Sequence, residues 1–477
     1  MRTYIPRKRY IIWPGLLALL IILAGCSGIG DAPPAAPQPT LVLSQTPASG
    51  TTQAPTSTTT TSIVDWTTYH NDHARTGYIP NMPDPKSLAR AWSKQLDGAV
   101  YAEPLVVNGH VIVATEGDTL YSLDANTGQV LWHTNVGKPV PLSQLPCGNI
   151  DPLGITGTPV YDPNTRLVFA VVEVTGFSHI LVGIDVDTGK VRVRQPVDAP
   201  GMDARAHQQR AALALANGMV YIAYGGLDGD CSDYIGRVVA LHTNGQGPLL
   251  VYTVPTSREG GIWAPAGPAV DANGNIYVAV GNGASTGGNW DHSDSVLKLS
   301  PTLHLLDGFA PQQWPQDNAS DADLGSMSPV LLPGGFIYAD GKSGQAYVLR
   351  ADRLGGVGGQ IAEATVCRAF GGSAIQDSTI IVPCVDGIRQ VQIGQDGQIS
   401  VGWRAPGQIT GSPVIGGHTV YSLDPGSGTL YALNSANGNV VATLAVDAAS
   451  RFATPTLFNG MVFVGTLSGV TAVKINS

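Results

Sequence analysis

The side chains best suited to hold a ligand in this 477-residue chain are charged and polar groups that we expect near Trp263. We expect them to meet at the mouth of a central channel, and they are Glu103, His207, Gln209, Arg210, Arg258, Glu259, Asp321, Asp323 and Ser326. Charges of both signs around an indole suit a polar ligand, and the indole offers an apolar or sugar-stacking surface. The alternative is that Arg210, Glu259 and Asp323 form an ion-pair network that only holds strands together.

Three aspartates lie close together in one predicted loop and are candidates for a calcium site. Asp317, Asp321 and Asp323 could supply the oxygen ligands that Ca²⁺ prefers. No complete calcium-loop spacing surrounds them, so a solvated acidic loop is the competing interpretation. The sequence contains no complete catalytic set, and it therefore assigns no catalytic residue.

The N-terminus carries a targeting signal. Basic residues precede an apolar run that ends in Leu23-Ala24-Gly25-Cys26, which resembles a bacterial lipoprotein signal. The resemblance implies that residues 1–25 are removed and that Cys26 is acylated, and a plain signal peptide or an uncleaved anchor is the alternative. Residues 26–64 are rich in Pro, Thr and Ser, so we expect a disordered tether. These features predict a lipid-anchored protein that faces the extracytoplasmic space.

The other four cysteines, Cys147, Cys231, Cys367 and Cys384, are an even number in a compartment that permits disulfides. Three pairings are possible. We expect Cys147 to pair with Cys231, because they lie in loops of neighbouring repeats, and Cys367 to pair with Cys384 within one repeat. Four free thiols are the alternative.

A repeat of about 50 residues extends from residue 100 to the C-terminus. Its clearest element is an apolar strand that recurs eight times, at 111–114, 167–170, 220–223, 276–279, 336–339, 379–382, 419–422 and 461–464. A third strand follows each copy, and in most repeats a short Gly-containing turn comes after it. One four-stranded unit cannot bury both of its faces, so the units must pack radially on one another. The sequence predicts an all-β, eight-bladed propeller over residues 65–477.

The ends of the chain indicate how the ring closes. The eighth repeat runs out of sequence after its third strand, whereas residues 89–96 form an apolar strand that precedes the first repeat. We expect this N-terminal strand to complete blade eight, which leaves no gap in the ring.

The turns of the repeat resemble a known family. Leu123-Asp-Ala-Asn-Thr-Gly128 followed by Trp132 is similar to the repeat of pyrroloquinoline-quinone (PQQ) dehydrogenase-like propellers, and residues 66–78 resemble the segment that opens secreted propellers of this type. Propeller lipoproteins of the outer-membrane-assembly type are similar as well. The resemblance implies that Trp132 docks one blade against the next. It also implies a possible PQQ cofactor with calcium in the central funnel, with Trp263 as the stacking residue and Glu259 or Asp323 as the base.

Loop lengths distinguish the two faces of the predicted ring. Turns such as Asn108-Gly109 and Asn459-Gly460 are short hairpins, and we name their side the short-turn face. The long insertions share the other side, the long-loop face, and they are 133–157, 195–212, 224–236, 253–267, 281–294 and 307–327. Binding loops usually gather on one rim of a rigid scaffold. We therefore expect the functional site on the long-loop face.

The charge balance limits the class of partner. The net charge is −9, and removal of Arg2, Arg7, Lys8 and Arg9 with the signal leaves 22 basic and 35 acidic residues, or −13. An acidic surface repels nucleic-acid phosphates, so we expect no nucleic acid as partner. The preferred interpretation is a non-enzymatic propeller that binds a ligand or an envelope protein through its long-loop face. The alternative is a PQQ-dependent oxidoreductase.

Overall fold

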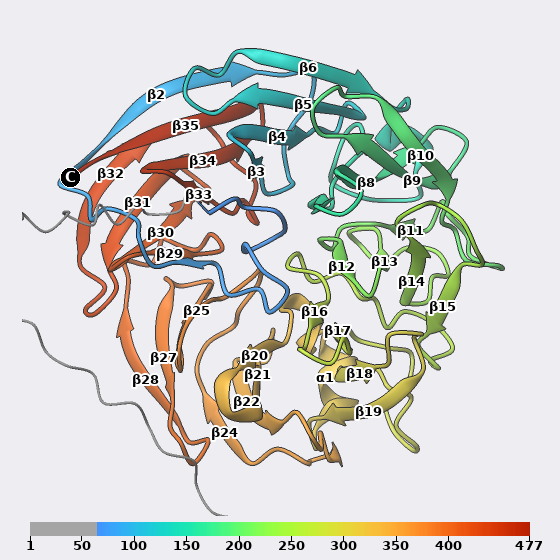
Figure 1. The fold of residues 1–477 in the computed structure, drawn as a ribbon. Helices are drawn as coiled ribbons and strands as arrows, with labels where there is room; N and C mark the ends of the chain where they lie inside the picture. Colours follow the sequence, from blue (N-terminus) through green and yellow to red (C-terminus); the bar gives the residue numbers. More distant parts are fainter. Residues whose placement is uncertain (1–63) are drawn as a thin grey trace, which may run out of the picture. The chain divides into compact units, whose positions relative to one another are not determined.

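The protein forms a ring of eight β-sheets around a central axis (Figure 1). The computed structural model describes residues 64–477. The predicted eight-bladed, nearly all-β propeller is confirmed. The predicted signal peptide, Cys26 and all but the last residue of the predicted tether lie outside the described residues. Within 64–477, no helix is both long and apolar enough to cross a membrane.

Blades one to four each place their first strand innermost, and short or irregular strands extend two of them. Blade one has β3 (Leu105–Val107), β4 (His110–Ala114), β5 (Thr119–Asp124) and β6 (Val130–Asn135), and blade two has β7 (Val160–Asp162), β8 (Leu167–Val174), β9 (Ser178–Asp185) and β10 (Val191–Pro196). Blade three has β11 (His207–Gln208), β12 (Ala214–Ala216), β13 (Met219–Gly226), β14 (Arg237–His242) and β15 (Leu250–Thr253). Blade four has β16 (Ala269–Val270), β17 (Ile276–Val280), β18 (Ser295–Leu299), β19 (Leu305–Ala310) and β23 (Gly356–Val357).

Blades five to eight follow the same order, and the few helical turns of the described chain lie between blades four and five or in loops. Blade five has β20 (Val330–Leu332), β21 (Phe336–Ala339), β22 (Gln345–Arg350) and β24 (Ala362–Thr365), and blade six has β25 (Ala374–Gln376), β26 (Thr379–Val382), β27 (Arg389–Ile393) and β28 (Ile399–Arg404). Blade seven has β29 (Val414–Gly416), β30 (Thr419–Asp424), β31 (Thr429–Asn434), β32 (Val440–Ala445) and β1 (Tyr78–Ile79), and blade eight has β33 (Thr456–Phe458), β34 (Met461–Thr466), β35 (Gly469–Asn476) and β2 (Ser87–Gln95). The helical turns are α1 (Trp314–Ser320), η1 (Leu142–Gln144), η2 (Leu324–Ser326) and η3 (Pro333–Gly335).

The N-terminal strand β2 closes the ring, as predicted. It runs antiparallel to β35, with Ser87 opposite Asn476 and Gln95 opposite Gly469. The observed strand begins two residues before the predicted 89–96 and ends one residue earlier. Because the first and last strands of the propeller share one sheet, hydrogen bonds of blade eight hold both ends of the ring together.

Tryptophans dock successive blades against one another. The Trp132 indole Nε1 of blade one donates a hydrogen bond to the Val186 carbonyl of blade two at 2.9 Å. Gly189 lies under the ring, and a Cβ at that position would be 2.8 Å from ring atoms. Position 189 therefore requires glycine for two reasons: a side chain would collide with the indole, and its φ of 69° is in the left-handed region. Trp92 and Trp403 make the same contact at two other blade junctions.

A segment that precedes the first blade closes the central channel at the short-turn face. We name residues 66–79 the plug segment, and Figure 1 shows it in blue over the middle of the ring. Its backbone carbonyls accept hydrogen bonds from inner-strand residues of blades one, two, four, six and seven, which are Val106, Tyr161, Val270, Ile375 and Ile415. Arg75 and Tyr69 extend these contacts to Leu213 in blade three and Thr454 in blade eight. The plug segment therefore ties most of the ring together at its axis.

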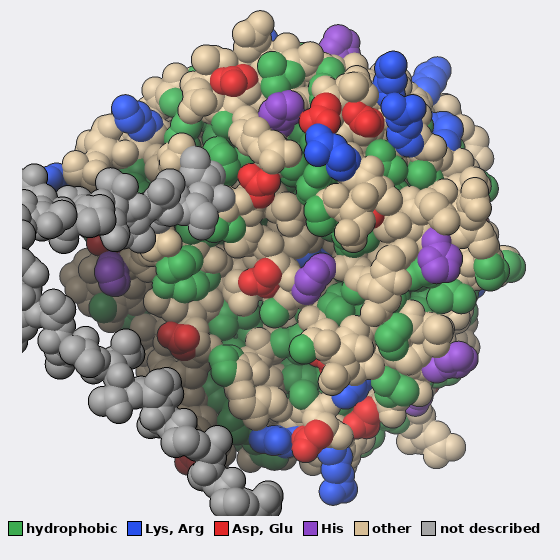
Figure 2. All heavy atoms as spheres, viewed as in Figure 1, with side chains coloured by type: hydrophobic (Ala, Val, Ile, Leu, Met, Phe, Trp, Pro, Cys, Tyr) green, Lys and Arg blue, Asp and Glu red, His purple; other side chains and the backbone are tan. Residues whose placement is uncertain are grey.

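Basic and acidic side chains are mixed on the face drawn in Figure 2. Lys and Arg side chains stand singly or in small groups among Asp and Glu, and most of this surface is uncharged. No continuous basic band crosses this view. The face thus resembles a general polar protein surface more than a polyanion-binding one.

Candidate functional site

An axial cavity of about 550 Å³ opens on the long-loop face. Its wall comes from blade crossovers, from the loops between second and third strands, and from the strand ends next to them. The lining residues are Tyr101, Asn149, Ile150, Gln208, Arg210, Gly226, Leu227, Asp228, Gly229, Asp230, Tyr234, Trp263, Asn282, Asp321, Lys342, Phe370, Ser450, Arg451, Phe452 and Leu467. This volume lies within the range of small-molecule sites. Arg210, Trp263 and Asp321 lie where the sequence places them.

Two arginines at the cavity wall lie over the faces of aromatic rings. The Arg210 guanidinium lies 4.2 Å from the centre of the Phe452 ring. The Arg451 guanidinium lies 4.0 Å from the Phe370 ring and 5.7 Å from Phe452. Burial lowers the pKa of Arg210 to about 10, which leaves the guanidinium protonated at neutral pH. Cation–π contacts thus hold two positive charges in fixed orientations beside the cavity.

Trp263 and Lys342 form a second part of the wall. The Trp263 ring meets Phe452 edge to face, with ring centres 6.4 Å apart, and the Lys342 ammonium lies 5.5 Å from its centre. Lys342 also forms ion pairs with Asp321 and with the buried Asp323, the latter at 2.9 Å. Burial opposes the charge of Lys342, but the Asp323 carboxylate raises its pKa above the ordinary lysine value. The indole therefore lies beside an ammonium that two carboxylates keep charged.

Two of the three aspartates of the predicted calcium loop are held by a lysine. Asp323 caps η2 by accepting a hydrogen bond from the Gly325 backbone N–H at 2.6 Å, and it also holds Lys342. Asp321 ends α1 and lines the cavity, whereas Asp317 lies within α1 and is nearly buried. Within residues 64–477, no three His, Cys, Asp or Glu side chains are arranged to hold a metal ion. Asp321 and Asp323 thus connect the loop between β19 and β20 to Lys342.

Arg258 and Glu259 pair with each other rather than with Arg210 or Asp323. The Arg258 Nη2 atom lies 3.1 Å from Glu259 Oε1. The Asn282 amide donates a weak hydrogen bond, 3.3 Å long, to the other carboxylate oxygen of Glu259. The expected alternative network of Arg210, Glu259 and Asp323 does not form. Glu259 pairs with Arg258 and Asp323 with Lys342, whereas Arg210 lies over the Phe452 ring and has no ion-pair partner among residues 64–477. Asn282 reaches the cavity, and Glu259 supports it from behind.

Glu103 and His207 are buried away from the cavity wall. The Glu103 carboxylate accepts hydrogen bonds from Trp66 Nε1 at 3.1 Å and from the His70 backbone N–H at 2.9 Å. It therefore holds the plug segment. The ring nitrogens of His207 contact the Asp203 and Ile235 carbonyls at 2.7 and 3.1 Å. Its imidazole thus connects two loop backbones and has no nitrogen left for a ligand.

Both predicted disulfides are present, and each holds a loop that lines the cavity. Cys147 is bonded to Cys231, and Cys367 is bonded to Cys384. The first disulfide flanks the stretches 149–150 and 226–230, which form one side of the cavity. The second lies next to Phe370, whose backbone N–H donates to the Pro383 carbonyl at 3.2 Å. The disulfides thus fix the positions of binding loops.

Sequence reasoning missed Phe370, Arg451, Phe452 and Lys342. Phe370 and the Arg451–Phe452 pair lie in the crossovers into blades six and eight, which are shorter than the long insertions. Lys342 lies in the tight loop between β21 and β22. An arginine next to a phenylalanine in a crossover of mostly small residues was the one available signal, because such a pair has no place in the blade repeat.

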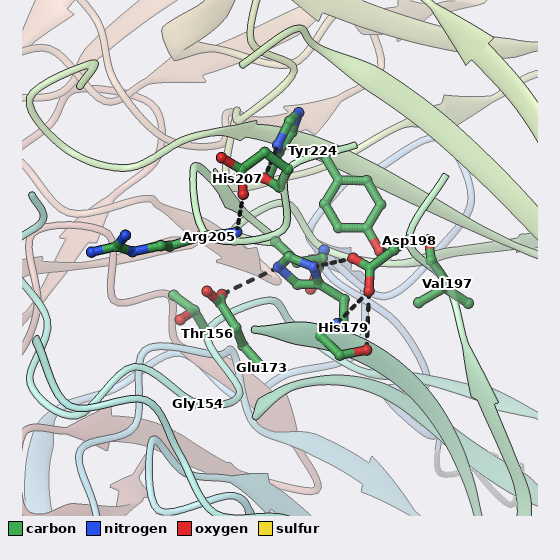
Figure 3. Close-up of polar contacts among 12 residues, drawn as sticks. Gly154, Thr156, Glu173, His179, Val197, Asp198, Arg205, His207 and Tyr224 are labelled. Atoms are coloured by element: carbon green, nitrogen blue, oxygen red, sulfur yellow. Dashed lines mark hydrogen bonds and ion pairs between the residues drawn. The ribbon is translucent and has the colours of Figure 1, made fainter. Parts of the chain in front are cut away.

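A buried charged cluster near the cavity was also not predicted. His179 in β9 lies between Glu173 in β8 and Asp198 (Figure 3), with nitrogen-to-oxygen distances of 3.4 and 2.6 Å. Burial opposes its protonation, but the two carboxylates raise the pKa of His179 to about 9. Tyr224 of blade three packs edge-on against the imidazole and donates to the Val197 carbonyl. The cluster joins blades two and three below the long-loop face.

Two further acids of blade one lie close to this cluster. Glu116 accepts hydrogen bonds from the Gly154 N–H and the Thr156 hydroxyl of blade two. Both carboxylate oxygens of Asp118 are buried and have no hydrogen-bond partner among residues 64–477. Burial raises the pKa of Glu116 to about 7 and that of Asp118 to about 8, and neighbouring carboxylates add to both effects. This part of the molecule therefore titrates near neutral pH.

Comparison with known proteins identifies two kinds of relative. A PQQ_2 family model described as outer membrane protein assembly factor BamB matches residues 84–279. Polyvinylalcohol dehydrogenase of Sphingopyxis sp. (strain 113P3) is 25% identical over 250 residues, which are 46% of this chain and 34% of that protein. The chain thus spans about a third of this curated relative.

Solved structures show the same fold. Quinohemoprotein alcohol dehydrogenase from Comamonas testosteroni superposes with a TM-score of 0.67 at 15% identity, over 86% of this chain and 80% of that one. BamB from Moraxella catarrhalis superposes with a TM-score of 0.55 at 14% identity, over 82% of this chain and 100% of that one. The predicted resemblance to PQQ-type propellers is confirmed in sequence pattern and fold.

Proposed function

We propose that this protein is a lipid-anchored, extracytoplasmic propeller that binds a ligand or an envelope protein through its long-loop face, with the axial cavity as the ligand site. One observation carries the proposal. The channel is closed by the plug segment at the short-turn face, whereas its other end is a cavity lined by charged and aromatic side chains. Ligands therefore have access from the long-loop face only. A small number of precisely placed polar groups among aromatic side chains is typical of binding sites.

The first described residues lie on the side of the ring opposite the cavity. Asp65 accepts a hydrogen bond from the backbone N–H of Asn108 in the β3–β4 turn, at the short-turn face. A chain anchored through Cys26 would enter the propeller on that side. The long-loop face is the opposite side of the ring, and it remains open to soluble ligands or neighbouring envelope proteins.

The anchoring part of the proposal has its own test. Full-length protein and a Cys26→Ser variant are expressed in a bacterial host and separated into membrane and soluble fractions. We expect the parent chain in the membrane fraction with a fatty-acyl mass on Cys26, and the variant in the soluble extracytoplasmic fraction. An unacylated Cys26 in the membrane-bound parent would contradict lipid anchoring.

A PQQ-dependent oxidoreductase is the second candidate, and the cavity wall favours it in one respect. PQQ is a planar tricarboxylate, and Trp263 with Lys342, Arg210 and Arg451 could hold its ring and its acidic groups. Bound PQQ would supply two-electron oxidation of an alcohol. The same residues do not fit a calcium ion held by side-chain acids, since residues 64–477 contain no such group of three.

The predicted bases argue for binding over turnover. Asp323 is fully buried and is occupied by Lys342 and the Gly325 N–H. Glu259 is held by Arg258 and Asn282. Neither carboxylate lines the cavity, so neither is placed to take a proton from a substrate hydroxyl there. The geometry therefore favours the binding function.

Titration of the full chain with PQQ, with and without Ca²⁺, separates the two candidates when it is combined with a dye-linked alcohol oxidation assay. The binding function predicts no PQQ-dependent dye reduction, whether or not PQQ binds. Stoichiometric binding with turnover that is lost in Asp323→Asn would overturn it. A Lys86→Gln variant, altered at an exposed residue outside the cavity, is the matched control.

A further inference from the structure

We propose that the axial cavity selects ring compounds that carry a carboxylate, and that Arg210, over Phe452, and Arg451, over Phe370, receive the acidic group. This inference rests on the cavity being the ligand site, and it names the class of ligand. Acidic saccharides with uronic-acid rings are the class that uses both parts of the wall.

The two arginines are the only cations lining the cavity that lack a partner in the part of the chain that the structure describes. Neither guanidinium forms a hydrogen bond or an ion pair with any residue of 64–477. Lys342, by contrast, is paired with two aspartates. A partly buried guanidinium without an acceptor is unusual, because arginine carries five N–H donors. A ligand oxyanion would supply the acceptors.

The stacking on phenylalanine explains how the arginines keep their donors available. A guanidinium that lies flat on a ring uses its face and leaves its N–H edge in the plane free. The guanidinium carbons of Arg210 and Arg451 lie over their rings at 4.2 and 4.0 Å from the ring centres, which is close enough for this arrangement. The free edge is the geometry that binds a carboxylate with two parallel hydrogen bonds. Packing on the rings also reduces the rotamer entropy that binding would cost.

The acids of the wall do not neutralise these arginines. Asp321 is paired with Lys342, and Asp230 accepts a hydrogen bond from the Tyr234 hydroxyl at 2.5 Å. Glu116 is the strongest negative neighbour of Arg210, but burial raises its own pKa to about 7, so its charge is partial at neutral pH. Asp228 is exposed and acts on Arg210 only weakly. A second arginine, Arg368, lowers the pKa of Arg451 further.

The aromatic part of the wall indicates the rest of the ligand. Trp263 and Phe452 are nearly perpendicular, with an interplanar angle of 69°, and both reach the cavity. An indole face stacks well on the C–H face of a sugar ring, and Asn282 and Gln208 add polar groups for hydroxyls. A ring of moderate size with one acidic substituent would contact Trp263 and the arginine pair together.

Isothermal titration of the full chain with digalacturonic acid and with its dimethyl ester tests the inference, because the two probes differ in charge and little else. We expect the acid to bind at least about tenfold more tightly at low salt, since charge-assisted bonds are the strong ones. Arg210→Gln and Arg451→Gln should each remove most of this preference. Arg192→Gln on the outer strand β10 removes the same charge far from the cavity and should leave the preference unchanged.

The other outcomes separate this inference from the proposed function. Equal binding of acid and ester, abolished in both by Trp263→Leu, would overturn acid selection and leave the cavity as the ligand site. Absence of acid binding would overturn the inference as well, whatever the PQQ titration gives. Thermal unfolding of each arginine variant checks that it is folded. If Arg451→Lys keeps part of the preference for the acid, the positive charge at this position contributes to recognition of the carboxylate.

Discussion

Buried ionisable side chains are concentrated where blades one, two and three meet beneath the long-loop face. Glu173, His179 and Asp198 form a chain of hydrogen bonds and ion pairs, and Glu116 and Asp118 lie close to them. Burial is the largest cause of the raised pKa values of Glu116, Asp118 and Glu173. The protonation of a few buried residues thus couples three blades.

Stability is predicted to fall as the pH rises from 6 to 10. His179 has a pKa near 9 in the folded protein and 6.5 when free, so its contribution is complete below 6.5 and is lost as the pH rises through 9. This difference corresponds to a free energy of unfolding on the order of 3 kcal/mol. Glu116 and Asp118, whose folded pKa values are near 7 and 8, act in the same direction. Thermal unfolding across this range checks the prediction, and a flat or rising Tm would contradict it.

A variant of Asp118 distinguishes the contribution of the buried acids to the pH dependence from that of His179. Its carboxylate has no hydrogen-bond partner within residues 64–477, and its pKa rises from 3.8 to about 8 on folding, so the cost of burying it grows between these pH values and is constant above them. Asp118→Asn removes this cost, and we expect a higher Tm than the parent at both pH 6 and pH 9, with the larger gain at pH 9. Asp396→Asn, at an exposed turn, is the control. A gain that is the same at both pH values would show that ionisation is not the cause.

At the scale of single elements, strand β6 depends on one indole for its contact with blade two. Trp132→Ala removes the hydrogen bond to Val186 and the packing on Gly189, which should lower the free energy of unfolding by about 2 kcal/mol. Its neighbour Leu131 is 45% exposed, so Leu131→Ala on the same strand is the matched control. Chemical denaturation measures both. Equal losses would mean that Trp132 does not dock the blades.

The two disulfides should differ in their effect on stability. Cys147–Cys231 spans 84 residues, whereas Cys367–Cys384 spans only 17. In the chain-entropy description, the longer loop gives the larger stabilisation, about 4.5 against about 3 kcal/mol. Denaturation of the two double Cys→Ser variants checks this order. A larger loss for the Cys367–Cys384 variant would contradict it.

Elements could be predicted from sequence because the propeller repeats them. Hairpins such as Asn108-Gly109 and the turns after the third strands recur about once in each repeat. Each of these turns is specified by a few neighbouring residues, so the sequence alone reveals it. The closing strand followed from a missing strand at one end and an extra one at the other. Within the cavity, Arg210 and Trp263 lie in long insertions that the same pattern exposes.

The remaining features depend on contacts that no local pattern encodes. Glu103 meets Trp66 across 37 residues, and it therefore holds the plug segment rather than a ligand. Tyr69 meets Thr454 across 385 residues. Lys342 determines the environment of Asp323 from a neighbouring loop. Only the folded ring brings these pairs together.

At the scale of the whole molecule, the plug segment connects most blades through one arginine and its neighbours. Arg75 is buried and donates to the Leu213 carbonyl at 2.9 Å, the Pro268 carbonyl at 3.2 Å and the Thr68 hydroxyl at 2.6 Å. Arg75→Ala leaves these acceptors unsatisfied and should cost about 3 kcal/mol or more. Denaturation measures the loss, with Lys86→Ala, an exposed residue just before β2, as control. A change below about 1 kcal/mol would mean that the ring is stable without this anchor.

Ligands are proposed to enter the axial cavity from the long-loop face. Hydrogen–deuterium exchange of the full chain, with and without digalacturonic acid or PQQ, tests this route. We expect a bound probe to slow exchange in peptides covering 226–234 and 447–455 and to leave the short-turn peptides around 108–109 and 459–460 unchanged. Protection confined to the short-turn face, or to the outer strands, would contradict it.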